Sequence, residues 1–190
     1  MDDTSGMDKR QLRQYFLAQR QQLSPPQWQA KSQQLCEHLS QQALFQQAKT
    51  VCAYVSYQQE ADLSSLFFLP KVWGLPRCVN KQLLWSTWHP KAPLVPDKYG
   101  ILVPELTAPL LDPTQVDLIL VPTLAGDRRG YRLGYGGGYY DRLFAQPAWQ
   151  AIPRIGIVFA MAIVDYLPAD PWDLPLGGLC TEIGYWERED

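Results

Sequence analysis

The sequence predicts a single α/β domain over residues 1–190, with a mainly parallel central sheet between helical layers. Segments with helical periodicity alternate with short apolar segments along the chain. Residues 117–121 and 154–159 are apolar almost throughout, as expected of strands that are covered on both faces of a sheet. The length of 190 residues fits one domain, and no internal repeat or linker divides the chain.

Two helices are expected near the N-terminus. The first, over about residues 8–22, follows from apolar side chains at helical spacing, at Leu12, Tyr15, Phe16 and Leu23. Ser24 can cap a second helix, with Pro25 at its first position and Gln27 completing a capping box. This helix is expected to reach about residue 43 and to bury Trp28, Leu35 and Leu39.

The remaining elements follow from local composition. Further strands are expected where β-branched and apolar residues cluster, at residues 50–56, 75–79, 83–89 and 180–184. Asn80 and Lys81 form a turn between the second and third of these. Short helices are expected over residues 63–69 and 138–146, and the proline-rich segment 90–113 is interpreted as an ordered surface connection.

The charge balance and hydropathy argue against two classes of partner. The chain has 17 basic and 19 acidic residues and a sequence pI near 5.7, which disfavours a broad surface for nucleic acid. The longest apolar stretch, residues 155–164, is half the roughly 20 residues needed to span a membrane. The charged N-terminal residues lack the apolar region of a signal peptide. A cytoplasmic protein without membrane contact is therefore expected.

The cysteines do not indicate a zinc site. They are far apart in sequence, form no C-x-x-C pair and are accompanied by only two histidines: Cys36, Cys52, Cys78 and Cys180. Reduced and partly buried thiols are the expected state.

One segment differs from the rest, the run GDRRGYRLGYGGGYYDR over residues 126–142. It follows the 117–121 strand closely and precedes a possible helix. Glycines at 134, 136, 137 and 138 allow successive backbone N–H groups to turn inward and bind phosphate oxygens. Arg132 could neutralise phosphate charge, and Asp141 could hold the Mg²⁺ of a nucleoside triphosphate. Flat apolar surfaces for a ring system are offered by Tyr135, Tyr139 and Tyr140.

Two other interpretations of this segment remain open from the residues alone. It can be a flexible surface loop, because its spacing matches neither GxxxxGK[ST] nor GxGxxG. Its Arg-Gly-Tyr composition is also similar to that of disordered RNA-binding segments. The run is short, occurs once and lies between apolar strands, which favours a ligand-binding loop at the end of a strand.

The run RLGYGGGYYDR at residues 132–142, after DLILVP, closely resembles the signature of the 5-formyltetrahydrofolate cyclo-ligase family, also called 5,10-methenyltetrahydrofolate synthetase. The resemblance spans nearly the whole chain. Weaker matches support it: the basic run at 9–13, Glu60 with Asp62, Gly100-Ile101, Pro168, Asp173 and Thr181-Glu182.

The resemblance implies a fold similar to sugar-phosphate isomerases and CoA-transferases. A monomer or weak dimer is expected. It also implies Mg²⁺- and ATP-dependent conversion of 5-formyltetrahydrofolate into 5,10-methenyltetrahydrofolate, with release of ADP and phosphate. Phosphoryl transfer to the formyl oxygen would activate the carbon for attack by N10. Such a reaction depends mainly on positioning and charge neutralisation, so the absence of a Ser/His or Cys/His constellation is compatible with it.

The same resemblance assigns roles to individual residues. Catalysis is assigned to Arg132 and Tyr139. ATP binding is assigned to Lys9, Arg13, Arg132, Leu133, Gly134, Tyr135, Gly136, Gly137, Gly138, Tyr139 and Tyr140. Folate binding is assigned to Val55, Glu60, Tyr135, Gly136, Gly137, Gly138 and Tyr139, and Mg²⁺ binding to Asp141 and Asp173. From spacing alone, Lys9 and Arg13 also fit a solvated helix face, and Glu60, Asp62 and Asp173 also fit turns.

The chain departs from the family pattern at four positions: Val103, Gly126, Ala162 and Trp172. These departures leave a second hypothesis open, a catalytically weak or inactive folate- or nucleotide-binding protein of the same fold. A third is a relative of sugar-phosphate isomerases or acyl-CoA transferases, which would need a catalytic carboxylate and no ATP.

Overall fold

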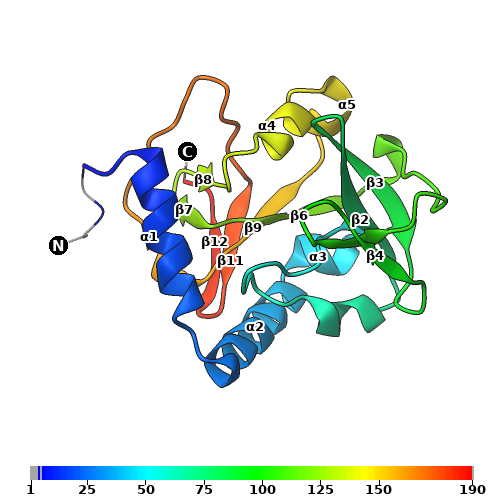
Figure 1. The fold of residues 1–190 in the computed structure, drawn as a ribbon, viewed down its shortest axis with the longest axis horizontal. Helices are drawn as coiled ribbons and strands as arrows, with labels where there is room; N and C mark the ends of the chain where they lie inside the picture. Colours follow the sequence, from blue (N-terminus) through cyan, green and yellow to red (C-terminus); the bar gives the residue numbers. More distant parts are fainter. Residues whose placement is uncertain (1–3, 5, 190) are drawn as a thin grey trace.

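A seven-stranded sheet forms the centre of the computed structural model, which describes residues 4 and 6–189 (Figure 1). In spatial order its strands are β12 (Gly184–Glu187), β11 (Gly178–Thr181), β9 (Arg154–Ile157), β6 (Leu118–Pro122), β1 (Thr50–Cys52), β2 (Val72–Val79) and β3 (Gln82–Trp88). Adjacent strands from β11 to β2 run parallel, and β12 and β3 add antiparallel edges. The expected mainly parallel sheet is confirmed.

Helices cover both faces of the sheet. Their bounds are α1 (Lys9–Gln21), α2 (Pro25–Ser40), α3 (Ala43–Gln47), α4 (Tyr139–Phe144) and α5 (Pro147–Gln150), with short 3-10 helices at Ser64–Phe68, Pro113–Gln115 and Ala160–Ala162. Residues of α1, α4 and α5 share one apolar cluster with one face of the sheet, and residues of α2 and α3 share the other cluster. No helix of the described part of the chain is long and apolar enough to cross a membrane.

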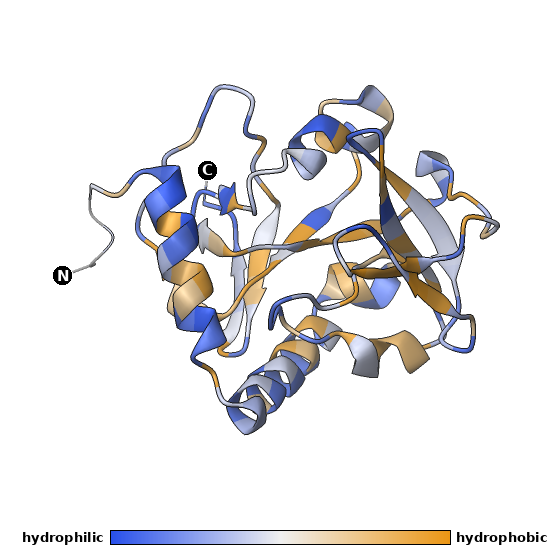
Figure 2. Ribbon diagram, viewed as in Figure 1, coloured by the Kyte–Doolittle hydropathy of each residue, from blue (hydrophilic) through white to orange (hydrophobic). Residues whose placement is uncertain are grey.

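The strand β6 shows why the core has two sides. Its side chains alternate, so that Ile119 and Val121 belong to the cluster of α1 and α4, whereas Leu118 and Leu120 belong to that of α2. All four side chains are fully buried. In Figure 2 the path of β6 is mostly orange, whereas α1 has both blue and orange turns. The continuous apolar run in the sequence is thus explained by burial on both faces.

Two smaller sheets accompany the central one and were not expected from the sequence. A three-stranded sheet consists of β10 (Ile163–Val164), β7 (Ala125–Asp127) and β8 (Arg132–Leu133). A hairpin consists of β4 (Leu94–Pro96) and β5 (Leu102–Pro104), within the segment that was interpreted as a surface connection. The first of these sheets leads directly into the glycine-rich segment.

Several sequence-based boundaries are corrected. The second helix has the expected capping box at Ser24, but it ends at Ser40 and a separate helix begins at Ala43. Trp28 is only half-buried, and its indole N–H donates to the carbonyl of Glu60 (2.8 Å). The strand expected over residues 50–56 ends at Cys52, and the last strand is a hairpin of β11 and β12.

The turn at Asn80 and Lys81 is confirmed. Both residues have positive φ, 47° and 64°, as a tight turn between β2 and β3 requires.

Candidate active site

A cavity of about 610 Å³ opens where β1 and β6 end. Tyr54 and Val55, just after β1, and Pro122, the last residue of β6, lie in its wall. The carboxyl ends of parallel strands are where open α/β sheets bind ligands. The remaining wall comes from α1, the turn at 57–60, β2 and β3, the segment 132–141, the β4–β5 hairpin and the segment 170–173.

Every site residue expected from the sequence lies in the wall of this cavity. Lys9 and Arg13 come from α1, and Val55 and Glu60 come from the segment between β1 and the first 3-10 helix. The glycine-rich segment contributes Arg132, Leu133, Gly134, Tyr135, Gly136, Gly137, Gly138, Tyr139, Tyr140 and Asp141. Asp173 completes the set from the C-terminal part of the chain. Residues up to 164 positions apart are thus brought together.

The glycine-rich loop, residues 134–138, turns the chain from β8 into α4. Gly136 and Gly138 have φ of 91° and 63°, a region that only glycine adopts without strain. A Cβ atom on Gly137 would lie 2.9 Å from the ring of Tyr139. The loop therefore requires glycine for its backbone angles at two positions and for space at a third.

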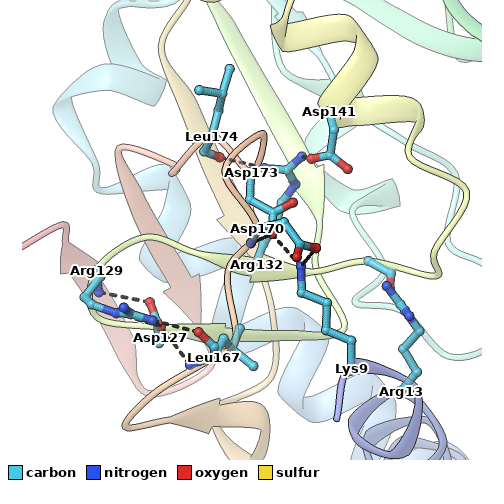
Figure 3. A network of polar contacts seen from close by, with 11 residues as sticks. Lys9, Arg13, Asp127, Arg129, Arg132, Asp141, Leu167, Asp170, Asp173 and Leu174 are labelled. Carbon is cyan, nitrogen blue, oxygen red and sulfur yellow. Dashed lines mark hydrogen bonds and ion pairs between the residues drawn. The ribbon is translucent and has the colours of Figure 1, made fainter.

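Arg13 of α1 contacts this loop directly. Its Nε donates to the carbonyl oxygen of Gly134 at 2.8 Å. A Cβ atom on Gly136 would stand 3.3 Å from the Arg13 guanidinium carbon. The side chain of Arg13 thus lies against the loop at the cavity wall. Figure 3 shows this side chain extending from α1.

Arg132 and Asp141 form an ion pair beside the loop (Figure 3). Arg132 also donates to the carbonyl oxygen of Leu174 at 2.9 Å, and its side chain is only 6% exposed. Burial lowers the pKa of the Arg132 guanidinium from its ordinary value, and the charge of Asp141 opposes that effect. The Asp141 side chain remains 32% exposed in the cavity wall.

Lys9 pairs with two carboxylates of the C-terminal segment. Its Nζ lies 2.5 Å from Asp170 and 2.6 Å from Asp173, and Asp173 also accepts from the backbone N–H of Asp170 (Figure 3). Burial raises the pKa of Asp173, but the hydrogen bonds from Lys9 and Asp170 outweigh it, so the pKa lies below its usual value. The sequence alone does not identify Asp170 as a site residue, because its only signal there is its position three residues before Asp173.

Glu60 lies at the other end of the cavity in a tight turn. Gln58 and Gln59 have φ of 47° and 59°, and the Glu60 carboxylate accepts the N–H of Tyr57 at 3.0 Å. Burial raises the pKa of Glu60 to about 7, although the charge of Arg20 and the Tyr57 hydrogen bond act in the opposite direction. A carboxyl group of this kind can change its proton state near neutral pH.

Aromatic and apolar side chains line the outer part of the cavity. Tyr99 from the β4–β5 hairpin lies with its hydroxyl 3.4 Å from that of Tyr139. Tyr99, Leu102 and Trp172 are all substantially exposed and line the cavity. Tyr99 and Leu102 show no periodic signal in the sequence, because they lie within a short hairpin rather than in a long element.

Of the four residues that depart from the family pattern, three lie outside the cavity wall and one lies in it. Val103, Gly126 and Ala162 are buried outside the cavity wall. Gly126 packs so closely that a Cβ would be 2.7 Å from Leu179. Trp172 alone among the four lines the cavity.

The acidic residues suit a metal that shares its ligands with phosphates. Among residues 4 and 6–189, no group of three or more His, Cys, Asp or Glu side chains could hold an ion by itself. Mg²⁺ is commonly held by one or two carboxylates, with phosphate oxygens and waters as the other ligands. Asp141 and Asp173 fit that requirement because both line the cavity beside basic residues.

Comparisons with known proteins point in one direction. The sequence model of the 5-formyltetrahydrofolate cyclo-ligase family matches residues 5–182. A protein of Escherichia coli K12 named 5-formyltetrahydrofolate cyclo-ligase is 29% identical over 178 residues, which cover 88% of this chain and 97% of that protein. One of Mycolicibacterium smegmatis with the same name is 32% identical, with 70% of this chain and 73% of that protein covered.

Two solved structures are similar to this one. The 5,10-methenyltetrahydrofolate synthetase of Aquifex aeolicus has a TM-score of 0.85 at 32% identity, with 97% of this chain and 94% of that chain covered. The synthetase of Mycoplasma pneumoniae has a TM-score of 0.75 at 24% identity, with 93% and 99% covered, and it supports the fold alone.

Proposed function

The chain belongs to the 5-formyltetrahydrofolate cyclo-ligase family, and on that premise we propose that it converts 5-formyltetrahydrofolate into 5,10-methenyltetrahydrofolate with Mg²⁺ and ATP. The observation that carries the proposal is the single cavity. It combines a glycine-lined part, which carries the cations Lys9, Arg13 and Arg132, with an apolar part that ends in a buried carboxyl group, Glu60. A triphosphate and a reduced folate are a matching pair of ligands.

The glycine-lined part suits the triphosphate. Lys9, Arg13 and Arg132 reach it from α1 and from β8, and the backbone of the glycine-rich loop lies between them. Guanidinium groups and backbone N–H groups are good donors to phosphate oxygens. In this proposal ATP binding also involves Leu133, Tyr139 and Tyr140.

Asp141 and Asp173 would hold Mg²⁺ together with the phosphates. The ion, when bound, supplies charge neutralisation at the phosphates. The ion pairs of Asp141 with Arg132 and of Asp173 with Lys9 support this proposal, because they would orient both carboxylates in the cavity wall.

The other part suits the folate. Val55 offers apolar surface, and Glu60 can accept hydrogen bonds from the N–H groups of a pterin when its carboxyl is ionised. Tyr135 lies between the two parts, because it belongs to the glycine-rich loop and its ring is 6.4 Å from that of Tyr57. The loop would thus contact both ligands.

The proposed reaction has two steps. The formyl oxygen attacks the γ-phosphorus, and the bond from that phosphorus to ADP breaks. The N10 lone pair then attacks the formyl carbon, and phosphate leaves with the former formyl oxygen while N10 loses its proton. Arg132 would neutralise charge on the transferred group and Tyr139 would position it, so that orientation and electrostatics supply the catalysis.

The test is a turnover assay with 5-formyltetrahydrofolate and Mg-ATP, run in parallel without ATP. We expect the ultraviolet absorbance of the methenyl product to appear only with ATP, together with one ADP per product. Binding of both ligands without product at high protein concentration would contradict the proposal and favour a non-catalytic binding protein. Product without ATP would contradict the role of the triphosphate.

A further inference from the structure

Arg20 is a buried charge that is not part of the cavity wall. It lies in the last turn of α1 and is only 4% exposed. Burial of a guanidinium is costly unless its N–H groups are paired. Its partners therefore indicate what the residue does.

Those partners belong to two separate segments of the site. Arg20 Nε donates to the carbonyl oxygen of Gln58 at 3.0 Å, and Nη2 donates to the hydroxyl of Tyr135. The guanidinium carbon also lies 5.5 Å from the centre of the Tyr135 ring, within the range of a cation–π contact. One side chain thus joins α1 to the turn at 57–60 and to the glycine-rich loop.

The contact is repeated two helical turns earlier. Arg13, seven residues before Arg20 and on the same face of α1, donates to the carbonyl of Gly134. Helix α1 therefore holds two successive residues of the loop, Gly134 through its backbone and Tyr135 through its side chain. The two arginines differ because Arg13 lines the cavity and Arg20 lies behind it.

Arg20 also determines the electrostatic surroundings of Glu60. The groups that face this carboxyl are Tyr57 in its own turn, Tyr54 after β1, Tyr135 in the loop, Tyr140 in α4 and Arg20 in α1. Arg20 is the cation in that set. Loss of its charge would remove the largest of the effects that oppose burial, leaving only the hydrogen bonds from Tyr57 and Tyr135, and would favour the protonated carboxyl.

We propose that Arg20 is a positioning residue, which holds Tyr135 of the glycine-rich loop against the turn that carries Glu60 and so fixes one end of the cavity. The proposal rests on the proposed function only in naming that end as the folate end. The juxtaposition of Arg20, Gln58 and Tyr135 stands without it.

The first test uses hydrogen exchange and does not depend on activity. Arg20→Met keeps the apolar length of the side chain but removes its donors, and Arg10→Met, at an exposed position of the same helix, is the control. We expect at least tenfold faster exchange of the backbone amides at 57–60 and 134–138 in Arg20→Met, because charge-assisted hydrogen bonds are lost. The control should not change them. Equal exchange in both variants, or faster exchange spread evenly over the protein, would overturn the proposal.

The second test measures the proton state of Glu60 by NMR with ¹³C-labelled glutamate. The titration midpoint of Glu60 is expected to rise by about one pH unit in Arg20→Met and to stay unchanged in Arg10→Met. Arg20→Lys, which keeps the charge but not the fork of donors, should restore the midpoint while leaving exchange of the loop fast. An unchanged midpoint in Arg20→Met would contradict the placement of Arg20 as the cation that faces Glu60.

Activity then separates this proposal from the proposed function. In an active protein, Arg20→Met should raise KM for 5-formyltetrahydrofolate about tenfold and raise KM for ATP by a smaller factor, because the loosened loop contacts both ligands in the proposed function. A rise confined to ATP would overturn the assignment to the folate end. If the wild-type protein makes no methenyl product, the proposed function fails, and the exchange and titration results still decide the role of Arg20.

Discussion

Arg132 and Asp141 form an ion pair across the glycine-rich loop, although nine positions separate them in the sequence. Arg132 is in β8, before the loop, and Asp141 is in the first turn of α4, after it. The pair therefore closes the loop at its base. Because Arg132 also donates to the carbonyl of Leu174, the C-terminal segment is attached to the same point.

Replacement of Arg132 by lysine should impair both the loop and the binding of ATP. Lysine keeps the charge but cannot reach Asp141 and the Leu174 carbonyl with one planar fork. We expect a rise of at least tenfold in KM for ATP and a melting temperature about 5 °C lower. Steady-state kinetics and thermal unfolding measure the two effects. Arg128→Lys, at an exposed position nearby, is the matched control and should change neither.

The parts of the fold that depend on local sequence could be predicted. The apolar run of β6, the capping box at Ser24 and the turn at Asn80 each carry their signal within a few residues. The glycine-rich loop was also recognisable, because its composition and its place after a strand are local. Its residues, together with Lys9, Glu60 and Asp173, do line one cavity.

The parts that depend on long-range contacts could not be predicted. Arg20 looks like a solvated residue of α1, and its burial follows from Tyr135, 115 positions away. Asp170 gains its role from Lys9, 161 positions away. The strands β7 and β8 are two or three residues long and contain Gly126 and Arg132, so they show no apolar alternation.

Gly137→Asp should abolish ATP binding and leave the fold intact. The backbone of Gly137 does not have positive φ and the residue is exposed, so the substitution causes no backbone strain. The new side chain would meet the ring of Tyr139 at 2.9 Å and place a negative charge where phosphate is expected. Calorimetric titration with Mg-ATP should show no binding, while circular dichroism stays unchanged. Wild-type affinity in this variant would remove the phosphate-binding role from the loop.

The serine variant at the same position separates the two causes of that loss. Gly137→Ser brings the same clash with Tyr139 without the charge. We expect it to retain part of the ATP affinity, because electrostatic repulsion is absent. Equal loss in both variants would assign the effect to the displaced Tyr139 ring alone.

Asp127→Asn should destabilise the protein far more than a surface ion pair would. Asp127 is fully buried and accepts hydrogen bonds from Arg129 (2.6 Å) and from the backbone N–H groups of Leu167 (2.9 Å) and Tyr131 (3.1 Å), as Figure 3 shows in part. Asparagine has one acceptor oxygen and no charge, so Arg129 loses its ionic partner and keeps only its hydrogen bond to the Leu167 carbonyl among these contacts. A loss of about 3 kcal/mol or more in the free energy of unfolding is expected, measured by urea denaturation.

The control is Glu189→Gln, in an exposed ion pair at 3.4 Å, which should cost less than about 0.5 kcal/mol in the free energy of unfolding. Similar losses in the two variants would contradict this interpretation.

Glu60→Gln should change how stability depends on pH. Burial raises the pKa of Glu60 to about 7 in the folded protein, above its ordinary value of 4.5, despite the opposing charge of Arg20. Between these pH values the folded protein binds a proton that the unfolded chain does not bind. The contribution of Glu60 to stability is therefore fully present below about pH 4.5 and is lost as the pH rises through 7.

Glutamine cannot titrate, so the variant should gain stability relative to the wild type over this range, by up to about 3 kcal/mol. Urea unfolding at intervals from pH 5 to pH 8 measures the difference. Glu37→Gln, at an exposed position of α2, is the control and should follow the wild-type curve. Parallel curves for wild type and Glu60→Gln would show that the carboxyl is already ionised throughout this range.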